Sequence, residues 1–228
     1  VMLLATLLDQ ASLDERQAAL AALGDLQHPS ATALLRQQLE RLAAGKLDTS
    51  LELDLLEAAE RHEALAPLLA KQRSVLDVDD PLAAFRPCLD GGDVKAGRQV
   101  FRDFEATRCT RCHALGGDGG NAGPPLDGIG KRLSASELLE SLVLPNARIA
   151  DGYATMLVER RDGSVVMGTI AREDEHTLVV VDATGHATEI ARADVLLRET
   201  SGGSAMPPMG ALLSRRQLRD LIAFLRQQ

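Results

Sequence analysis

The fold of this chain is decided by residues 93–126, which read DVKAGRQVFRDFEATRCTRCHALGGDGGNAGPPL. Gly97 and Phe101 lie on one face of a helix that can begin at the start of this stretch. We expect that helix to end as Cys109-Thr-Arg-Cys112-His113 arrives. A glycine-rich loop over 116–123 follows directly.

The spacing of Cys109, Cys112 and His113 has a specific chemical use. The thiols stand one helical turn apart, so both can form thioether bonds to the vinyl groups of one haem. The adjacent histidine is then held beneath the iron. The motif predicts one covalently attached haem c per chain, with His113 as the proximal iron ligand.

Three alternative interpretations of this motif stay open. They are a redox CxxC pair, a zinc site that adds Cys88 to the motif residues, and a chance occurrence in a loop. A zinc site usually has a second close pair of ligands, whereas Cys88 stands alone. A thioredoxin-like motif should open a helix in a βαβ pattern, which is absent here. The sequence therefore favours haem.

A c-type haem also needs a second axial ligand well downstream. Residues 204–209, Ser-Ala-Met-Pro-Pro-Met, offer two thioether sulfurs just before the last helical segment. We expect Met206 to be this ligand, with Met209 as the alternative. If neither methionine binds, the iron is five-coordinate or is bound by His176 or His186.

Residues 1–74 have the pattern of consecutive helices. The expected helices begin at the capping box Ser12–Glu15, at Ser30, near Thr49 and at Pro67, and the first two stop near Gly24 and Gly45. Such helices favour stacked antiparallel pairs that resemble HEAT-type repeats. Residues 75–92 are rich in turn signals, so we expect a linker there.

After residue 150 the pattern changes to β. Strands are expected over 153–161, 164–171, 177–182, 186–190 and 195–197, with turns at Asp162-Gly163 and Gly185. Five short strands suffice for a small antiparallel barrel or sandwich. We therefore expect a mainly α fold with a β insert at 151–198. The interrupted helical domain would comprise 93–150 and 199–228, the last helix beginning at Ser214.

Charge and hydropathy exclude some partners. The net charge of -8 and the pI near 5.2 argue against nucleic acid, which binds clustered Lys and Arg. An acidic surface suits a basic or neutral protein partner. No apolar run is long enough for a membrane span. Because the chain begins at Val1, we expect a mature form or a piece of a longer protein.

The chain resembles class I cytochrome c domains over residues 93–150 and 199–228. The shared landmarks are Gly97-x-x-x-Phe101, Cys109-Thr-Arg-Cys112-His113, Gly123-Pro-Pro-Leu126 and Met206-Pro-Pro. The resemblance implies that the Gly97/Phe101 face crosses a Leu221/Phe224 face. It also implies that the Pro124 carbonyl orients His113 and that Leu126 packs on the haem.

The order of helical repeats, motif helix, Leu144-Pro145-Asn146, β insert and Ser-x-Met-Pro loop resembles a second group. These are the haem-binding C-terminal domains of large, often propeller-bearing, sugar dehydrogenase-like bacterial proteins. The resemblance implies a periplasmic or other extracytoplasmic electron-transfer module, with no catalytic activity of its own. Its electrons would come from an upstream dehydrogenase domain or a redox protein partner.

Two other functions compete with electron transfer. An enzyme or gas sensor would need an open sixth position on the iron, which the Met206 loop argues against. A structural interaction module would instead use the helices and the β insert to dock partners.

Overall fold

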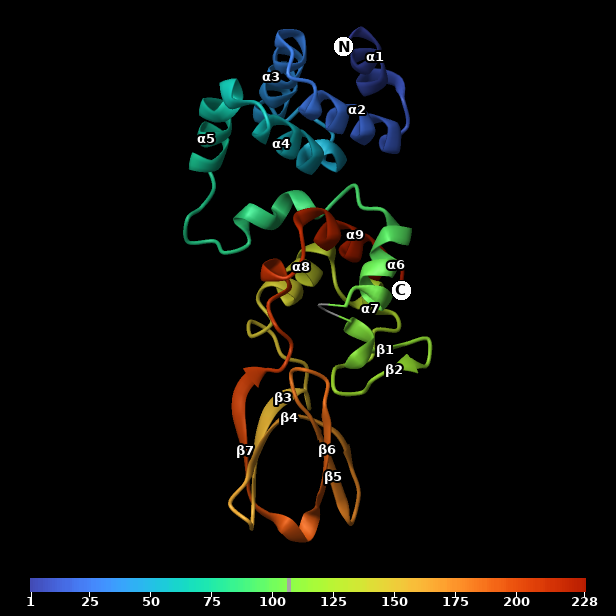
Figure 1. Ribbon diagram of the computed structural model, residues 1–228, viewed down its shortest axis with the longest axis vertical. Coiled ribbons are helices and arrows are strands. Elements are labelled where there is room, and N and C mark those ends of the chain that lie inside the picture. Colours follow the sequence, from blue (N-terminus) through green and yellow to red (C-terminus); the bar gives the residue numbers. More distant parts are fainter. Residues whose placement is uncertain (106–107) are drawn as a thin grey trace. The chain divides into compact units, whose positions relative to one another are not determined.

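The computed structural model describes residues 1–105 and 108–228 (Figure 1). The junction between the expected motif helix and Cys109 therefore lies partly outside the described residues. The chain divides into two compact units, Val1–Asp93 and Val94–Gln228. The first is helical, and the second combines helices with a sheet. A helical fold that contains a β insert is thus confirmed.

Five α-helices form the first unit: α1 Met2–Gln10, α2 Leu13–Asp25, α3 Pro29–Ala43, α4 Glu52–Glu60 and α5 Ala66–Ser74. Short 3-10 helices, η1 Thr49–Leu51 and η2 Glu63–Leu65, precede α4 and α5. The core of the first unit consists of leucine and alanine side chains, including Leu20, Leu23, Leu35, Leu55 and Leu65. The helix expected at Ser30 begins one residue earlier, because the His28 ring accepts a hydrogen bond from the Ser30 N–H at 3.2 Å.

Residues 75–92, expected as a linker, contain the 3-10 helix η3 Ala83–Cys88 and belong to the first unit. The Gln17 side chain donates a hydrogen bond to the Gly91 carbonyl at 2.8 Å and ties this segment down. The turn signals around Cys88 favour a loop position for this thiol. The structure instead places Cys88, which is not joined in a disulfide, at the end of η3, where it is fully buried.

The helices of the second unit are α6 Val94–Asp103, α7 Ile129–Arg132, α8 Ala135–Val143 and α9 Arg215–Leu225, with the 3-10 helices η4 Cys109–Arg111 and η6 Met209–Ala211. Helices α6 and α9 pack closely. A Cβ added to Gly97 would lie 1.9 Å from the Asp220 carbonyl oxygen. The rings of Phe101 and Phe224 lie 5.5 Å apart, so the crossing implied by the resemblance is present.

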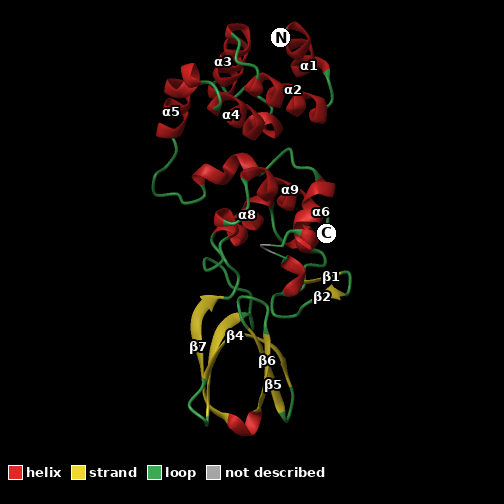
Figure 2. Cartoon of the chain, in the orientation of Figure 1, coloured by secondary structure: helices red, strands yellow, loops and turns green. Residues whose placement is uncertain are grey.

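The strands of the insert are β3 Ala154–Arg160, β4 Val165–Glu173, β5 Thr177–Val181, β6 Ala187–Ala191 and β7 Val195–Ser204. They form one antiparallel sheet in the order β6-β5-β4-β3-β7, with the 3-10 helix η5 Arg192–Asp194 between β6 and β7. The sheet is grouped apart from the α-helices of this unit (Figure 2). Its edges are β6 and β7, which leaves the expected barrel or sandwich unconfirmed. A separate pair consists of β1 Ala114–Leu115, directly after His113, and β2 Asp118–Gly119 in the glycine-rich loop.

Strand β4 changes partners along its length. Residues 165–168 pair with β3, and residues 169–173 pair with β5. A Cβ on Gly168 would lie 2.2 Å from the Val181 carbonyl oxygen, so only glycine fits at this change. Strand β7 continues to Ser204, past residue 198 where the insert was expected to end. The sheet thereby leads directly into the Met206 loop.

Among residues 1–105 and 108–228, no helix is both long enough and apolar enough to cross a membrane.

Candidate haem site

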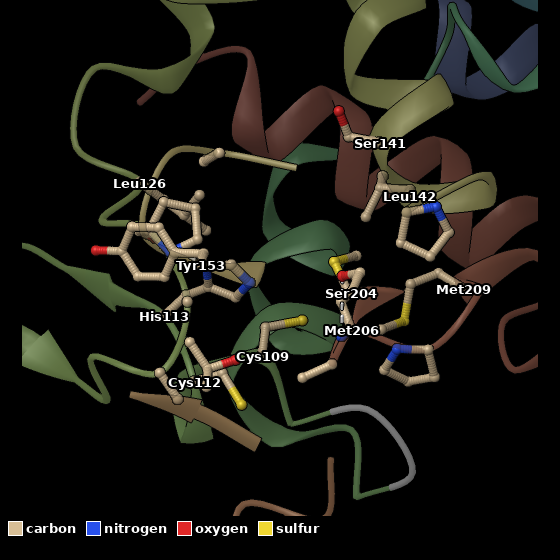
Figure 3. A pocket seen from close by; sticks show the side chains of 18 of the residues that line it. Cys109, Cys112, His113, Leu126, Ser141, Leu142, Tyr153, Ser204, Met206 and Met209 are labelled. Atoms are coloured by element: carbon tan, nitrogen blue, oxygen red, sulfur yellow. Dashed lines mark hydrogen bonds between the residues drawn. The ribbon is translucent and has the colours of Figure 1, made fainter. Parts of the chain in front are cut away.

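The second unit contains an apolar cavity of about 420 Å³. This volume lies within the range of roughly 300–1,000 Å³ that is usual for cofactor and ligand pockets. The residues expected at the haem all line it: Cys109, Cys112, His113, Pro124, Leu126 and Met206. In Figure 3, the motif residues lie on one side of the cavity, and Met206 and Met209 lie on the other.

The two cysteines belong to a tight turn. Cys109 opens η4, and the His113 N–H donates to the Cys109 carbonyl at 2.9 Å. Both side chains are half-buried thiols rather than a disulfide. Burial raises the pKa of the Cys112 thiol, as does the nearby Asp182 carboxylate, while Arg111 opposes them. The thiols therefore face the same apolar space from a single turn.

His113 has the orientation and protonation of a metal ligand. Its Nδ1 lies 2.8 Å from the Pro124 carbonyl oxygen, which can only accept, so Nδ1 carries the proton. Burial lowers the pKa of His113, although the Pro124 hydrogen bond opposes this shift. The ring is thus neutral, and Nε2 keeps its lone pair for a metal.

Gly123 makes room for this imidazole. A Cβ at Gly123 would lie 2.6 Å from His113 Cε1 and 2.8 Å from Nδ1. The ring therefore rests against bare backbone, with the Pro124 carbonyl fixing its rotation. The Gly-Pro-Pro sequence holds the histidine from two directions.

The loop that contains the two methionines is anchored to the helical part of this unit. The Ser204 N–H donates to Asn146 Oδ1 at 2.8 Å, and the Met206 N–H donates to Ser204 Oγ at 3.1 Å. Met206 is half-buried, whereas Met209 opens η6 and is 4% exposed. Both methionines line the cavity.

The remaining candidate ligands are placed less favourably. His176 and His186 are exposed and are not among the residues that line the cavity. Within the described ranges, no three His, Cys, Asp or Glu side chains are grouped to hold a metal ion. The zinc interpretation therefore has no ligand set in this part of the chain.

Sequence reasoning missed much of the cavity wall. The insert contributes Thr169, Val181, Asp182, Ala183, Thr184 and Gly185. Tyr153, expected as the first residue of a strand, precedes β3 and lies in the cavity near His113 and Leu126 (Figure 3). The periodicity of α8 could have indicated Leu138 and Leu142, but no local pattern indicates where a hairpin turn docks.

Residues 94–175 match the model of the Cytochrome c family. The second unit therefore contains a cytochrome c domain. The match includes the CxxCH motif and the Gly-Pro-Pro-Leu segment, and it ends inside the insert before Met206. The cofactor of this domain is covalently bound haem c. A search of curated proteins finds no match to the chain.

The residues of the cytochrome c domain fit this cofactor. Two thiols on one turn can supply both thioether bonds, and a neutral imidazole with its Nε2 unprotonated can supply the axial nitrogen. The surrounding wall is apolar, as a porphyrin face requires.

Proposed function

We propose that the cytochrome c domain is a one-electron carrier whose haem is attached to Cys109 and Cys112 and ligated by His113 and Met206. The supporting observation is that the half-buried His113 ring, hydrogen-bonded to Pro124 at 2.8 Å, shares one apolar cavity with both thiols and the Met206 loop. When bound, the haem supplies an iron that gains or loses one electron.

Each residue of the site has a separate task in this proposal. Pro124 keeps the proton on His113 Nδ1 and so fixes which nitrogen meets the metal. A Met206 thioether, as a soft ligand, favours the ferrous state and raises the reduction potential. Leu126 and the other apolar lining residues keep water from the porphyrin face.

We assign the distal position to Met206 rather than to Met209. Met209 opens η6, which packs against α8, and this residue is buried, with only 4% of its surface exposed. Met206 is half-buried at the cavity wall, and its backbone is held by Ser204. The Met206 side chain is therefore less restricted by packing than that of Met209 and can reach a metal more readily. With both axial positions filled, we expect no catalytic activity at the iron.

For the wider setting we propose a periplasmic or other extracytoplasmic electron-transfer module. The acidic charge of -8 favours a basic or neutral redox partner, or an upstream dehydrogenase domain of the propeller-bearing type. The consecutive helices α1 to α5 support a HEAT-like arrangement of the first unit.

The test uses protein matured in a host that assembles c-type cytochromes. We expect a haem-stained band on a denaturing gel and a low-spin visible spectrum that changes little when carbon monoxide is added. Cys109→Ala combined with Cys112→Ala should remove the stained band, whereas Cys88→Ala, which alters the first unit, should keep it. A wild-type chain without covalent haem would overturn the proposal, and metal analysis for zinc would follow.

A further inference from the structure

The β5–β6 turn, residues 182–186, lies at the end of the sheet that faces the α-helices of this unit (Figure 2), and residues 182–185 line the cavity. Arg111, which lies between the two motif cysteines, donates to the Thr184 carbonyl oxygen at 3.5 Å. A Cβ built on Gly185 would lie 3.2 Å from Arg111 Cδ, so the turn packs against the arginine stem. The turn thus covers the cavity beside Cys112.

A second contact fixes the insert against the glycine-rich loop. Asn121 Nδ2 donates to the Ala171 carbonyl oxygen of β4 at 2.7 Å. Strand β4 pairs with β5, which leads into the β5–β6 turn, so this bond fixes the sheet next to the turn while Arg111 contacts the turn itself. The turn is therefore held in place and is not a free loop tip.

The β5–β6 turn also contributes a negative charge. Asp182 Oδ1 accepts hydrogen bonds from the Thr184 N–H at 2.8 Å, the Thr184 hydroxyl at 2.6 Å and the His186 N–H at 3.0 Å. These bonds, led by the Thr184 hydroxyl, lower the pKa of Asp182 and keep it ionised. Burial is the main cause that raises the pKa of the Cys112 thiol; Arg111 opposes this rise, and the charge of Asp182 adds to it.

Asp182 is the only acidic residue among the described residues that line the cavity. The other charged lining residues are arginines: Arg108, Arg111, Arg132 and Arg148. A lone carboxylate in this setting stabilises a more positive centre and destabilises a more negative one. Asp182 is half-buried, so its field is screened less than that of a fully exposed carboxylate.

We propose that the β5–β6 turn closes the Cys112 side of the cavity and that Asp182 lowers the reduction potential of the bound haem. The inference rests on the haem site proposed above. Loss of one electron to a redox partner leaves one more positive charge at the iron, and Asp182 favours that oxidised state. Asp182 is a positioning and tuning residue and does not ligate the metal.

The test compares the midpoint potentials of the intact holoprotein and two matched variants. Asp182→Asn removes the charge but keeps an Oδ1 that can accept the same hydrogen bonds. Asp174→Asn is the control, because Asp174 Oδ1 accepts the His176 and Thr177 N–H groups in a similar turn at the opposite end of β5. We expect a higher potential in Asp182→Asn and a smaller change in Asp174→Asn.

A third variant separates the effect of the charge on the midpoint potential from the effect of a disturbed turn. Asp182→Glu keeps the charge, so its potential should stay below that of Asp182→Asn even if the turn is disturbed. The inference is overturned if Asp182→Asn shifts the potential no more than Asp174→Asn does, or if Asp182→Glu matches Asp182→Asn. A wild type that lacks covalent haem would instead refute the proposed function.

Discussion

At the scale of single residues, Gly123 tests how tightly the histidine is held. In Gly123→Ala the new Cβ must displace the His113 ring, which lies 2.6 Å from the Cβ position. We expect weaker iron ligation, seen as a changed visible spectrum and a lower melting temperature. Gly203→Ala is the control, because its Cβ would meet only Asn146 Oδ1 at 3.9 Å. Equal effects of the two substitutions would refute the role given to Gly123.

The residue scale also shows what the sequence could and could not predict. Cys109, Cys112 and His113 lie within one turn, so their chemistry follows from local spacing. The Pro124 contact could be anticipated only through the family resemblance. Asp182 was missed because its place in the cavity depends on β-strand pairing and on docking between segments 73 residues apart, as the Arg111–Thr184 contact shows.

At the scale of elements, the α6–α9 crossing should be the least tolerant contact of the cytochrome c domain. Gly97→Ala gains about 1 kcal/mol of helix propensity. However, the added Cβ would lie 1.9 Å from the Asp220 carbonyl, so the helices must separate, at an overpacking cost of about 1–3 kcal/mol or more. We expect net destabilisation in urea unfolding. Gln99→Ala, on the exposed face of α6, should change stability little.

Helix α8 provides a pH-dependent test. The Ser134 N–H and the Arg148 guanidinium donate to Glu137, at 2.9 and 3.0 Å, and these bonds lower its pKa to about 2. Glu137 thus binds fewer protons in the folded state, and its stabilising effect is lost as pH falls from 4.5 towards 2. Glu137→Gln should be less stable than wild type at neutral pH. Urea unfolding should show this difference shrinking in acid, and a constant difference would contradict the account.

Elements differed in how far they could be predicted. The capping boxes at Ser134 and Ser214 and the Asp162-Gly163 turn are local signals, and the structure places helices and a hairpin there. The length of β7 depends on pairing with β3, so its continuation to Ser204 has no local signal. The change at Gly168, where β4 stops pairing with β3 and begins to pair with β5, also has no local sequence signal.

At the scale of the whole molecule, the chain consists of two compact units with their own cores. A fragment of residues 94–228 contains the complete cavity lining. We therefore expect this fragment to fold, to retain covalent haem and to show the visible spectrum of the full chain. Loss of the haem in the fragment, with the full chain intact, would show that the first unit is needed for the site.

The measurement that tests the central claim most directly is the near-infrared spectrum of the oxidised holoprotein, in which a methionine-to-iron charge-transfer band reports the distal ligand. Met206→Leu and Met209→Leu are matched variants, because each removes a sulfur while conserving volume. We predict that wild type and Met209→Leu show the band and that Met206→Leu lacks it. A band that is kept in Met206→Leu, or absent from the wild type, would contradict His113/Met206 ligation.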